Sequence, residues 1–369
     1  MNYNKIVQGI LDIGEAMLQS GAENFRLEDS FYRMCRSYGF KRSDVFVIPS
    51  NIQVTVETPE GEIITQIRHI ESSEPNFDQL DYLNNLCRYV CQHTPDENEM
   101  REKYLEVINR EPQKRITRYA AGIMGGTGFA VFFGCNLRDA VIAFIVSVMI
   151  VAVGDWLAKR ESNLLVYNGI LAFISEVIII GALKMGIAEH PDRIMIGIVM
   201  LLISGLSTTN GIRDLLQRDF ISGFINIMNS FLGAAGIAFG IGLAIILFHE
   251  GYSDHFILNH SVPIQLLSCT VACTGFALWF KIRGKQVWYN SIGAFFTWAI
   301  YVAVYAVKPS NFMATMIAAG FVGFYAFIMS RVNKAPSTIF LTASVFPLIP
   351  GPNLYYVMYG CVSQDPQMV

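Results

Sequence analysis

Hydrophobic and polar positions follow two rhythms along the first part of the chain. Apolar residues such as Ile6 and Ile10 recur at helical spacing, whereas apolar and polar residues alternate from Ile52 onward. Helical spacing predicts amphipathic helices, and alternation on both sides of a Thr58–Gly61 turn predicts a hairpin. The predicted elements are a helix over 4–19, a second helix ending at Tyr38, strands over 45–48, 52–56 and 63–67, and helices over about 77–93 and 96–109. Together they predict a small α/β domain with its own modest core.

The rest of the chain consists mostly of long runs without charged residues, apart from Glu176 in one of them. A helix needs about 20 apolar residues to cross a bilayer, and backbone groups in lipid have to bond one another. The nine runs are 119–137, 140–154, 163–183, 194–212, 220–248, 256–280, 286–307, 309–330 and 335–364. They predict nine transmembrane helices, and the second reaches full length only by including Asp155 and Trp156.

Composition agrees with a change of solvent between the two parts. Only 15% of the chain is charged, against roughly a quarter in soluble proteins. In residues 1–109, 18 acidic residues outnumber 10 basic ones, which argues against a nucleic-acid partner. The seven cysteines match no zinc or disulfide spacing, so neither a metal nor a cofactor is predicted.

Lysine and arginine gather in alternate loops of the predicted membrane part. The side that carries the N-terminal domain has 13 of them and the opposite side has 4. Positive residues accumulate in short loops that stay in the cytoplasm. The N-terminal domain is therefore predicted to be cytoplasmic.

Two short motifs occur twice at nearly the same offset. Residues 127–133 recur at 274–280 with five of seven positions identical, and Leu202–Gly205 recurs as Leu348–Gly351. Five predicted crossings fill the first unit, so the second unit would lie inverted in the membrane, as in many secondary transporters. The predicted domains are residues 1–112, a first repeat over 113–250 and a second repeat over 251–369.

The final helix of the first repeat has no counterpart in the sequence. The run 220–248 should recur from about residue 366, and the sequence ends at 369. We therefore expect ten helices in the full architecture, with the tenth absent here. The alternative is a protein with nine helices.

Each repeat contains one place where an apolar segment is interrupted by helix-breaking residues, Ser204-Gly205 and Pro350-Gly351. Broken helices at membrane depth are tolerated where they are buried in protein or line a cavity. We interpret both breaks as lining a polar path; the alternative is that both helices end there. Glu176 lies in the middle of its segment, and because an intramembrane carboxylate is costly it is a candidate proton carrier, the alternative being a structural role.

Polar residues near the breaks complete the candidate site. The candidate path for substrate and protons comprises Glu176, Ser204, Gly205, Thr208, Thr209, Asn210, Asn226, Asn229, Pro350, Gly351 and Asn353. The candidate cytoplasmic gate comprises Arg213, Asp214 and Asp219. Asn226 and Asn229 could equally hold helices together. No catalytic residue is predicted, because no intramembrane Ser/Lys pair, His cluster or Asp pair at catalytic spacing is found.

Four motifs resemble the threonine/serine exporter family, and together the resemblance covers essentially the whole chain. They are residues 17–29 (MLQSGAENFRLED), 45–50 (VFVIPS), 210–223 (NGIRDLLQRDFISG) and 348–351 (LIPG). The resemblance implies export of threonine, serine or a similar metabolite driven by the proton gradient, and split members of the family are linked to dicarboxylate export. Ser204 stands where the family usually has proline, so the first kink is expected to be softer.

We therefore expect a proton-coupled exporter of small amino acids in a bacterial plasma membrane. A dicarboxylate exporter of the same architecture is the alternative. A membrane-embedded hydrolase and a passive channel are less favoured, because the repeat and Glu176 point to a transporter. Whether the chain forms a homo-oligomer stays open.

Overall fold

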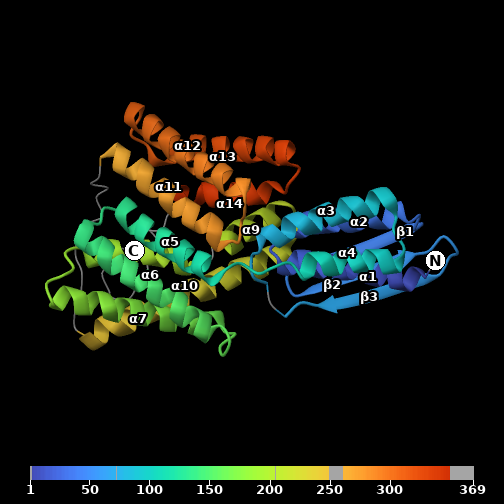
Figure 1. Ribbon diagram of the computed structural model, residues 1–369, viewed down its shortest axis with the longest axis horizontal. Helices are drawn as coiled ribbons and strands as arrows, with labels where there is room; N and C mark the ends of the chain where they lie inside the picture. Colours follow the sequence, from blue (N-terminus) through green and yellow to red (C-terminus); the bar gives the residue numbers. More distant parts are fainter. Residues whose placement is uncertain (1, 72, 204, 249–260, 350–369) are drawn as a thin grey trace.

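The computed structural model describes residues 2–71, 73–203, 205–248 and 261–349 (Figure 1). The N-terminal part has the predicted order of elements. These are α1 (Tyr3–Gln19), α2 (Asn24–Ser37), β1 (Arg42–Ile48), β2 (Asn51–Glu57), β3 (Ile63–His69), α3 (Phe77–His93) and α4 (Glu97–Ile108). The prediction of a small α/β layer is confirmed.

The three strands form an antiparallel sheet in the order β1-β2-β3, in which Val54 lies opposite Val45 and Gln66. Ile52, Val54 and Val56 of the central strand are at most 1% exposed, so one face of the sheet closes the core. Successive side chains of a strand point to opposite faces, which explains the alternation in the sequence.

The membrane part consists of helices. They are α5 (Arg115–Phe132), α6 (Leu137–Leu157), α7 (Leu164–Lys184), α8 (Pro191–Leu202), α9 (Gly205–Leu216), α10 (Phe220–Phe248), α11 (Val262–Trp279), α12 (Lys285–Val307), α13 (Asn311–Asn333) and α14 (Ser337–Val345), with a 3₁₀ turn, η1, at Phe346–Leu348. By length and composition, six helices in the described part of the chain could cross a membrane, or seven if α8 and α9 are one bent span. The count of nine crossings stays a prediction.

Some helices end at other residues than the predicted apolar segments, because turns and capping residues set the ends. The first apolar run was predicted to reach residue 137, but α5 ends at Phe132 and the chain turns at Gly134, whose φ of +104° favours glycine. Asn136 then caps α6, with Asp139 bonding back to the Asn136 N–H. Polar capping therefore decides a boundary that hydropathy alone does not mark. Residues 249–260 and everything after Ile349 lie outside the described residues, and so does the predicted place of a tenth helix.

Helices α5 and α11 cross at the centre of the membrane part, with α6, α7 and α10 on one side and α12 to α14 on the other (Figure 1). The crossing is close because it is made by glycines. A Cβ on Gly275 would lie 2.5 Å from the backbone N of Gly125, and a Cβ on Gly128 would lie 2.9 Å from the Cα of Ala272. Small residues let helix backbones approach in this way.

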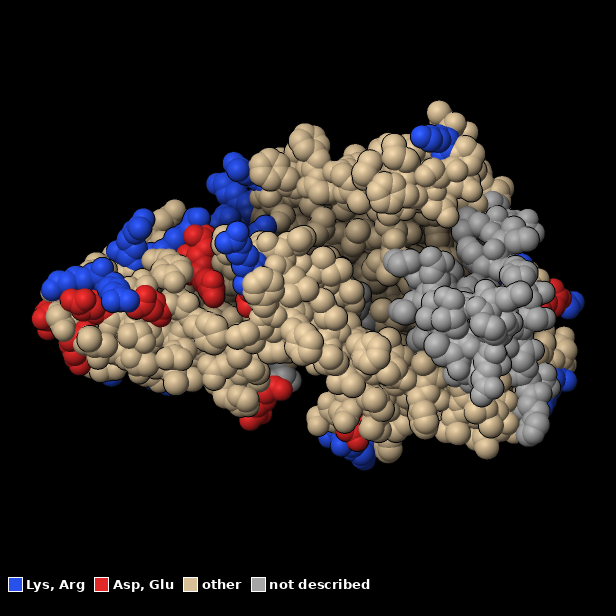
Figure 2. All heavy atoms as spheres, turned by 180° about the vertical axis from the view of Figure 1, so that it is seen from behind, with Lys and Arg blue, Asp and Glu red and all other residues tan. Residues whose placement is uncertain are grey.

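The N-terminal part is attached to the second half of the membrane helices by apolar contacts. Its core continues into Ala277 of α11, Ala326 of α13 and Phe340 of α14. Phe77, at the start of α3, stacks obliquely on Phe280 and donates its N–H to the Phe280 carbonyl at 3.0 Å. Figure 2 shows charged side chains gathered over the N-terminal part and its junction, and a broad uncharged band separating them from a few at the far end.

Candidate functional site

The first predicted break is a real interruption of a helix. Helix α8 ends at Leu202, Ile203 is extended (φ −73°, ψ 126°), and α9 continues after a bend of 57°. The bend leaves backbone carbonyls without helical partners. The Asn168 side chain of α7 donates to the carbonyls of Leu202, at 3.5 Å, and of Gly233, at 3.3 Å. An intramembrane amide thus stabilises the break.

The second break begins in the same way. Helix α14 passes into η1, and η1 is followed by Ile349, whose φ of −70° and ψ of 128° nearly equal those of Ile203. Ile203 and Ile349 are also matched by the repeat in the sequence. The backbone therefore leaves the helix at corresponding points of both halves.

A small cavity lies between α9 and α14, next to the two breaks. Its volume is about 20 Å³, room for roughly one water molecule. Polar residues line one side and apolar residues the other: Thr209, Asn210, Arg213, Thr338 and Thr342, then Leu341, Val345, Phe346 and Ile349. A hydroxyl-bearing ligand with a small apolar group matches this mixture, although a cavity of about 20 Å³ is too small to hold one.

A carboxylate from the N-terminal part reaches the rim of this cavity. Glu23 is the N-cap residue of α2, but its side chain makes no capping bond to that helix. Instead it forms an ion pair with Arg213 of α9 at 2.8 Å and accepts a hydrogen bond from the Thr338 hydroxyl of α14. Arg26 holds the other carboxylate oxygen at 3.0 Å. Glu23 is only 9% exposed, so a buried ionic contact joins three separate segments.

Further polar bonds form within α9 and between α9 and α10. The Arg213 guanidinium donates to the Asn210 side chain at 2.8 Å, and the Asn226 amide donates to the Asp214 carboxylate at 3.0 Å. Asp219 accepts from the Ser222 N–H at 3.2 Å and so caps α10. These bonds hold the short helix α9 in register with its neighbour.

A second carboxyl group of the N-terminal part, that of Glu28 in α2, also lies near this region. Burial raises the pKa of the Glu28 carboxyl, the nearby Asp219 raises it further, and a backbone hydrogen bond from Val47 opposes the shift. The N-terminal part therefore brings two carboxyls, Glu23 and Glu28, to the side of α9 and α10.

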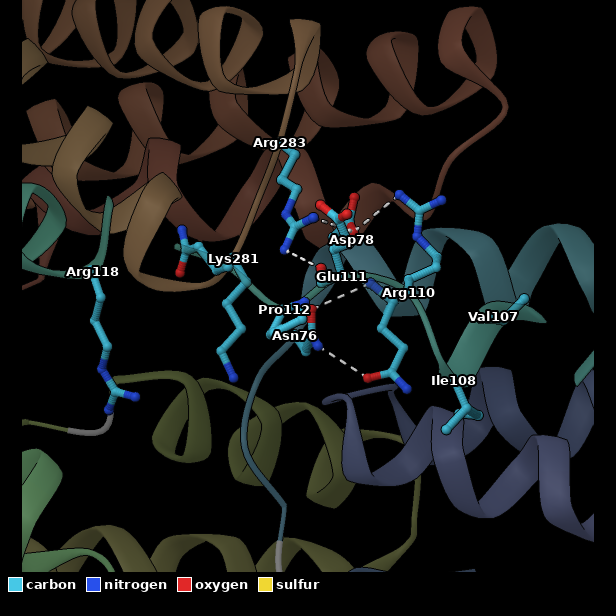
Figure 3. Close-up of a pocket in the computed structure, with 12 residues that line it drawn as sticks. Asn76, Asp78, Val107, Ile108, Arg110, Glu111, Pro112, Arg118, Lys281 and Arg283 are labelled. Atoms are coloured by element: carbon cyan, nitrogen blue, oxygen red, sulfur yellow. Dashed lines mark hydrogen bonds and ion pairs between the residues drawn. The ribbon is translucent and has the colours of Figure 1, made fainter. Parts of the chain in front are cut away.

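A second, larger cavity of about 280 Å³ lies at the junction with the N-terminal part (Figure 3). Asp78 pairs there with Arg110 at 3.5 Å and with Arg283 at 3.7 Å, while Arg283 also donates to the Glu111 carbonyl at 2.9 Å. The Lys281 ammonium pairs with Glu74 at 3.0 Å. The pairs of Lys281 with Glu74 and of Arg283 with Asp78 link the two parts of the chain, so this cavity lies at their attachment.

Two family models match the chain. Residues 8–248 match a threonine/serine exporter family, and residues 265–369 match the family described as "Threonine/Serine exporter, ThrE". The chain belongs to the threonine/serine exporter family. This family is one of transporters and not of enzymes.

Two bacterial proteins are similar to this exporter-family chain. A threonine/serine exporter of Corynebacterium glutamicum is 23% identical over 96% of the chain and 76% of the relative. A Mycobacterium tuberculosis protein named "Probable threonine/serine exporter" is 21% identical over 99% of the chain and 72% of the relative. No solved structure matches. The likeness spans both parts of the chain, so the exporter family includes the N-terminal α/β layer.

The structure distributes the candidate path residues of this exporter-family chain over several places. Thr209 and Asn210 come together at the small cavity with Arg213 of the candidate gate. The Thr208 hydroxyl instead donates to Ser230 of α10 at 2.9 Å, and Asn229 of α10 is exposed.

Glu176 lies apart from the small cavity. It is completely buried in α7, eight residues or about 12 Å along the helix from Asn168. It therefore does not face lipid, and a path to the breaks would run along α7. Gly205 begins α9, whereas Ser204, Pro350, Gly351 and Asn353 lie outside the described residues.

Four residues at or beside the breaks were missing from the candidate site: Glu23, Asn168, Thr338 and Thr342. Asn168 carried a usable signal, since a polar amide within an apolar segment needs a partner. Thr338 and Thr342 are one helical turn apart at the start of the ninth segment, which was also a readable pattern.

Proposed function

We propose that the chain exports threonine and serine through a path that passes between α9 and α14. The observation that carries this proposal is the small cavity where hydroxyl, amide and guanidinium groups of α9 and α14 meet beside the helix breaks. Discontinuous helices that present polar groups at membrane depth are a recurring form of transporter binding site. The family gives the substrate class, and the N-terminal part would lie in the cytoplasm of a bacterial cell.

We further propose an inverted repeat, formed by residues 113–250 and 251–369 behind a cytoplasmic domain of residues 1–112. The α5–α11 crossing supports it. Gly128 meets Ala272, and their repeat counterparts Gly275 and Gly125 meet each other as well. Such reciprocal contacts are the mark of a two-fold axis. The two helices run antiparallel at this contact, so the axis would lie in the membrane plane.

Proton coupling is proposed to involve Glu176. A buried intramembrane carboxyl can take up and release a proton as the transporter changes state. Its complete burial in α7 supports a role inside the bundle and excludes one at the lipid surface.

The lining of the small cavity favours amino acids over dicarboxylates. Among the described residues that line it, Arg213 is the only cation, and that arginine is already engaged with Glu23. A dicarboxylate would bring two negative charges to one guanidinium, whereas a zwitterion brings a single carboxylate. Hydroxyls at Thr209 and Thr342 also suit a hydroxylated side chain.

Counterflow in proteoliposomes tests the proposal. Vesicles loaded with unlabelled threonine should take up labelled threonine and serine but not succinate. The Thr342→Val variant should lower threonine exchange about tenfold, the equivalent of one lost hydrogen bond. Thr270→Val is the matched control, because Thr270 and Thr342 hydroxyls both donate to the carbonyl four residues earlier at 2.7 Å and only Thr342 lines the cavity. Succinate exchange without threonine exchange would contradict the proposal.

A further inference from the structure

The buried Glu23 carboxylate closes the rim of the small cavity from outside both membrane halves. Its two membrane contacts are Arg213 of α9, which follows the first break, and Thr338 of α14, which precedes the second. It thus stands between the two elements that a substrate has to pass. The N-terminal part thus brings a carboxylate to this place, and Arg26 beside it donates to the Ser337 hydroxyl of α14.

A free amino acid presents the same group. Its α-carboxylate is an acceptor of charge −1, and a guanidinium together with a hydroxyl is a donor set that suits it. Around the Glu23 carboxylate, Arg213 supplies the guanidinium at 2.8 Å and Thr338 supplies the hydroxyl. Asn210 fixes the Arg213 guanidinium from the side at 2.8 Å, which prepares its orientation.

We propose that Arg213 and Thr338 bind the α-carboxylate of the exported amino acid, and that Glu23 is an intramolecular competitor that holds this place when substrate is absent. This inference rests on the proposed function. The cavity of about 20 Å³ beside the pair accommodates no amino acid, so the substrate enters only after Glu23 withdraws. The cavity's threonine hydroxyls and its apolar wall then face the rest of the ligand.

Glu23 has a second partner that makes its withdrawal inexpensive. Arg26, one turn along α2, binds its other oxygen at 3.0 Å and is itself 46% exposed. A carboxylate that leaves Arg213 therefore stays paired with Arg26 and is not left as an isolated buried charge, which would be costly. Substrate and Glu23 can exchange on Arg213 in the manner of competing ligands.

Removal of the competitor should tighten binding. In full-length protein, Glu23→Gln keeps the shape of the side chain but loses its charge, so the apparent Kd for labelled threonine should fall about tenfold. Asp29→Asn is the matched control on the same helix, because Asp29 is 48% exposed and pairs with Arg33 at 2.8 Å on the surface. That control should bind threonine as the wild type does.

Removal of the receptor should abolish recognition of the carboxylate. Wild-type protein should prefer threonine to threoninamide, which lacks the carboxylate, and Arg213→Gln should lose that preference. Thr338→Val should weaken threonine binding more than threoninamide binding, because a hydroxyl bonds a carboxylate more strongly than an amide carbonyl. If Arg213→Gln does not elute as a folded protein in size-exclusion chromatography, Thr338→Val, which removes the hydroxyl donor, carries the same comparison.

The outcomes separate this inference from the proposed function. Absence of threonine and serine counterflow by the wild type would refute the proposed function. If counterflow by the wild type is normal but Glu23→Gln binds threonine no tighter than the wild type, Glu23 does not compete with substrate. If the Arg213→Gln and Thr338→Val variants prefer threonine to threoninamide as strongly as the wild type does, Arg213 and Thr338 do not bind the α-carboxylate.

Discussion

The glycine contact between α5 and α11 makes a quantitative prediction about helix packing. A Cβ on Gly275 would lie 2.5 Å from the Gly125 backbone N and 2.8 Å from the Ala121 carbonyl oxygen. Ordinary contacts begin at 3.4 Å, so Gly275→Ala forces the two backbones apart by about 0.9 Å. Backbone atoms cannot rotate away as a flexible side chain would. Overpacking of this kind costs about 1–3 kcal/mol.

A matched substitution isolates the packing effect. A Cβ on Gly320 of α13 would meet nothing within 4 Å, so Gly320→Ala should leave the free energy of unfolding unchanged or raise it by up to about 1 kcal/mol through helix propensity. The difference between the two variants should be about 2 kcal/mol. Equilibrium unfolding of the purified protein by SDS in mixed micelles measures it. Equal midpoints for Gly275→Ala and Gly320→Ala would refute the close crossing.

Three further substitutions test other parts of the structure. Glu176→Gln should abolish export driven by an imposed pH gradient while size-exclusion behaviour stays normal, and export at the wild-type rate would exclude the proton role. Asn168→Ala removes donors from carbonyls at the helix break and should lower the free energy of unfolding by about 0.6–1 kcal/mol in the SDS assay; no change would show that the break needs no such donor. Burial raises the pKa of the Asp81 carboxyl above 3.8, so the fold favours its neutral form and loses stability as pH rises through that pKa. The melting temperature of Asp81→Asn should therefore equal that of the wild type below about pH 4 and exceed it at neutral pH. A difference in melting temperature that stays constant across this range would contradict the raised pKa of Asp81.

The N-terminal elements were predictable because burial and local signals agree there. The helix over Phe77–His93 was predicted with those boundaries, since apolar residues repeat every turn and Asn76 caps its start. The membrane helices were found from their uncharged runs, but α5 begins at Arg115, four residues before its run. A long basic side chain can reach the membrane surface from inside a helix end, so charge alone misplaces such boundaries.

The candidate site was only partly predictable. Thr209, Asn210 and Arg213 could be named because a break in an apolar segment is visible in the sequence. Glu23 could not be assigned to them, because its contacts with Arg213 and Thr338 depend on how the N-terminal part docks on the membrane helices. No local pattern in the sequence encodes that long-range arrangement.

The two kinds of attachment between the N-terminal part and the membrane helices have different mechanical consequences. The membrane-helix members of the shared apolar core all lie between Ala277 and Ala343, in the second half. Contacts with the first half include the Arg213 ion pair and a 3.5 Å hydrogen bond from Ser222 to the Val47 carbonyl. Hydrogen bonds and ion pairs can be traded for water or other partners at little net cost, whereas separating packed apolar surface cannot. In any conformational change that separates α9 from α14, the N-terminal layer would therefore stay with α11, α13 and α14, against which it is packed, and would give up its polar contacts with α9 and α10.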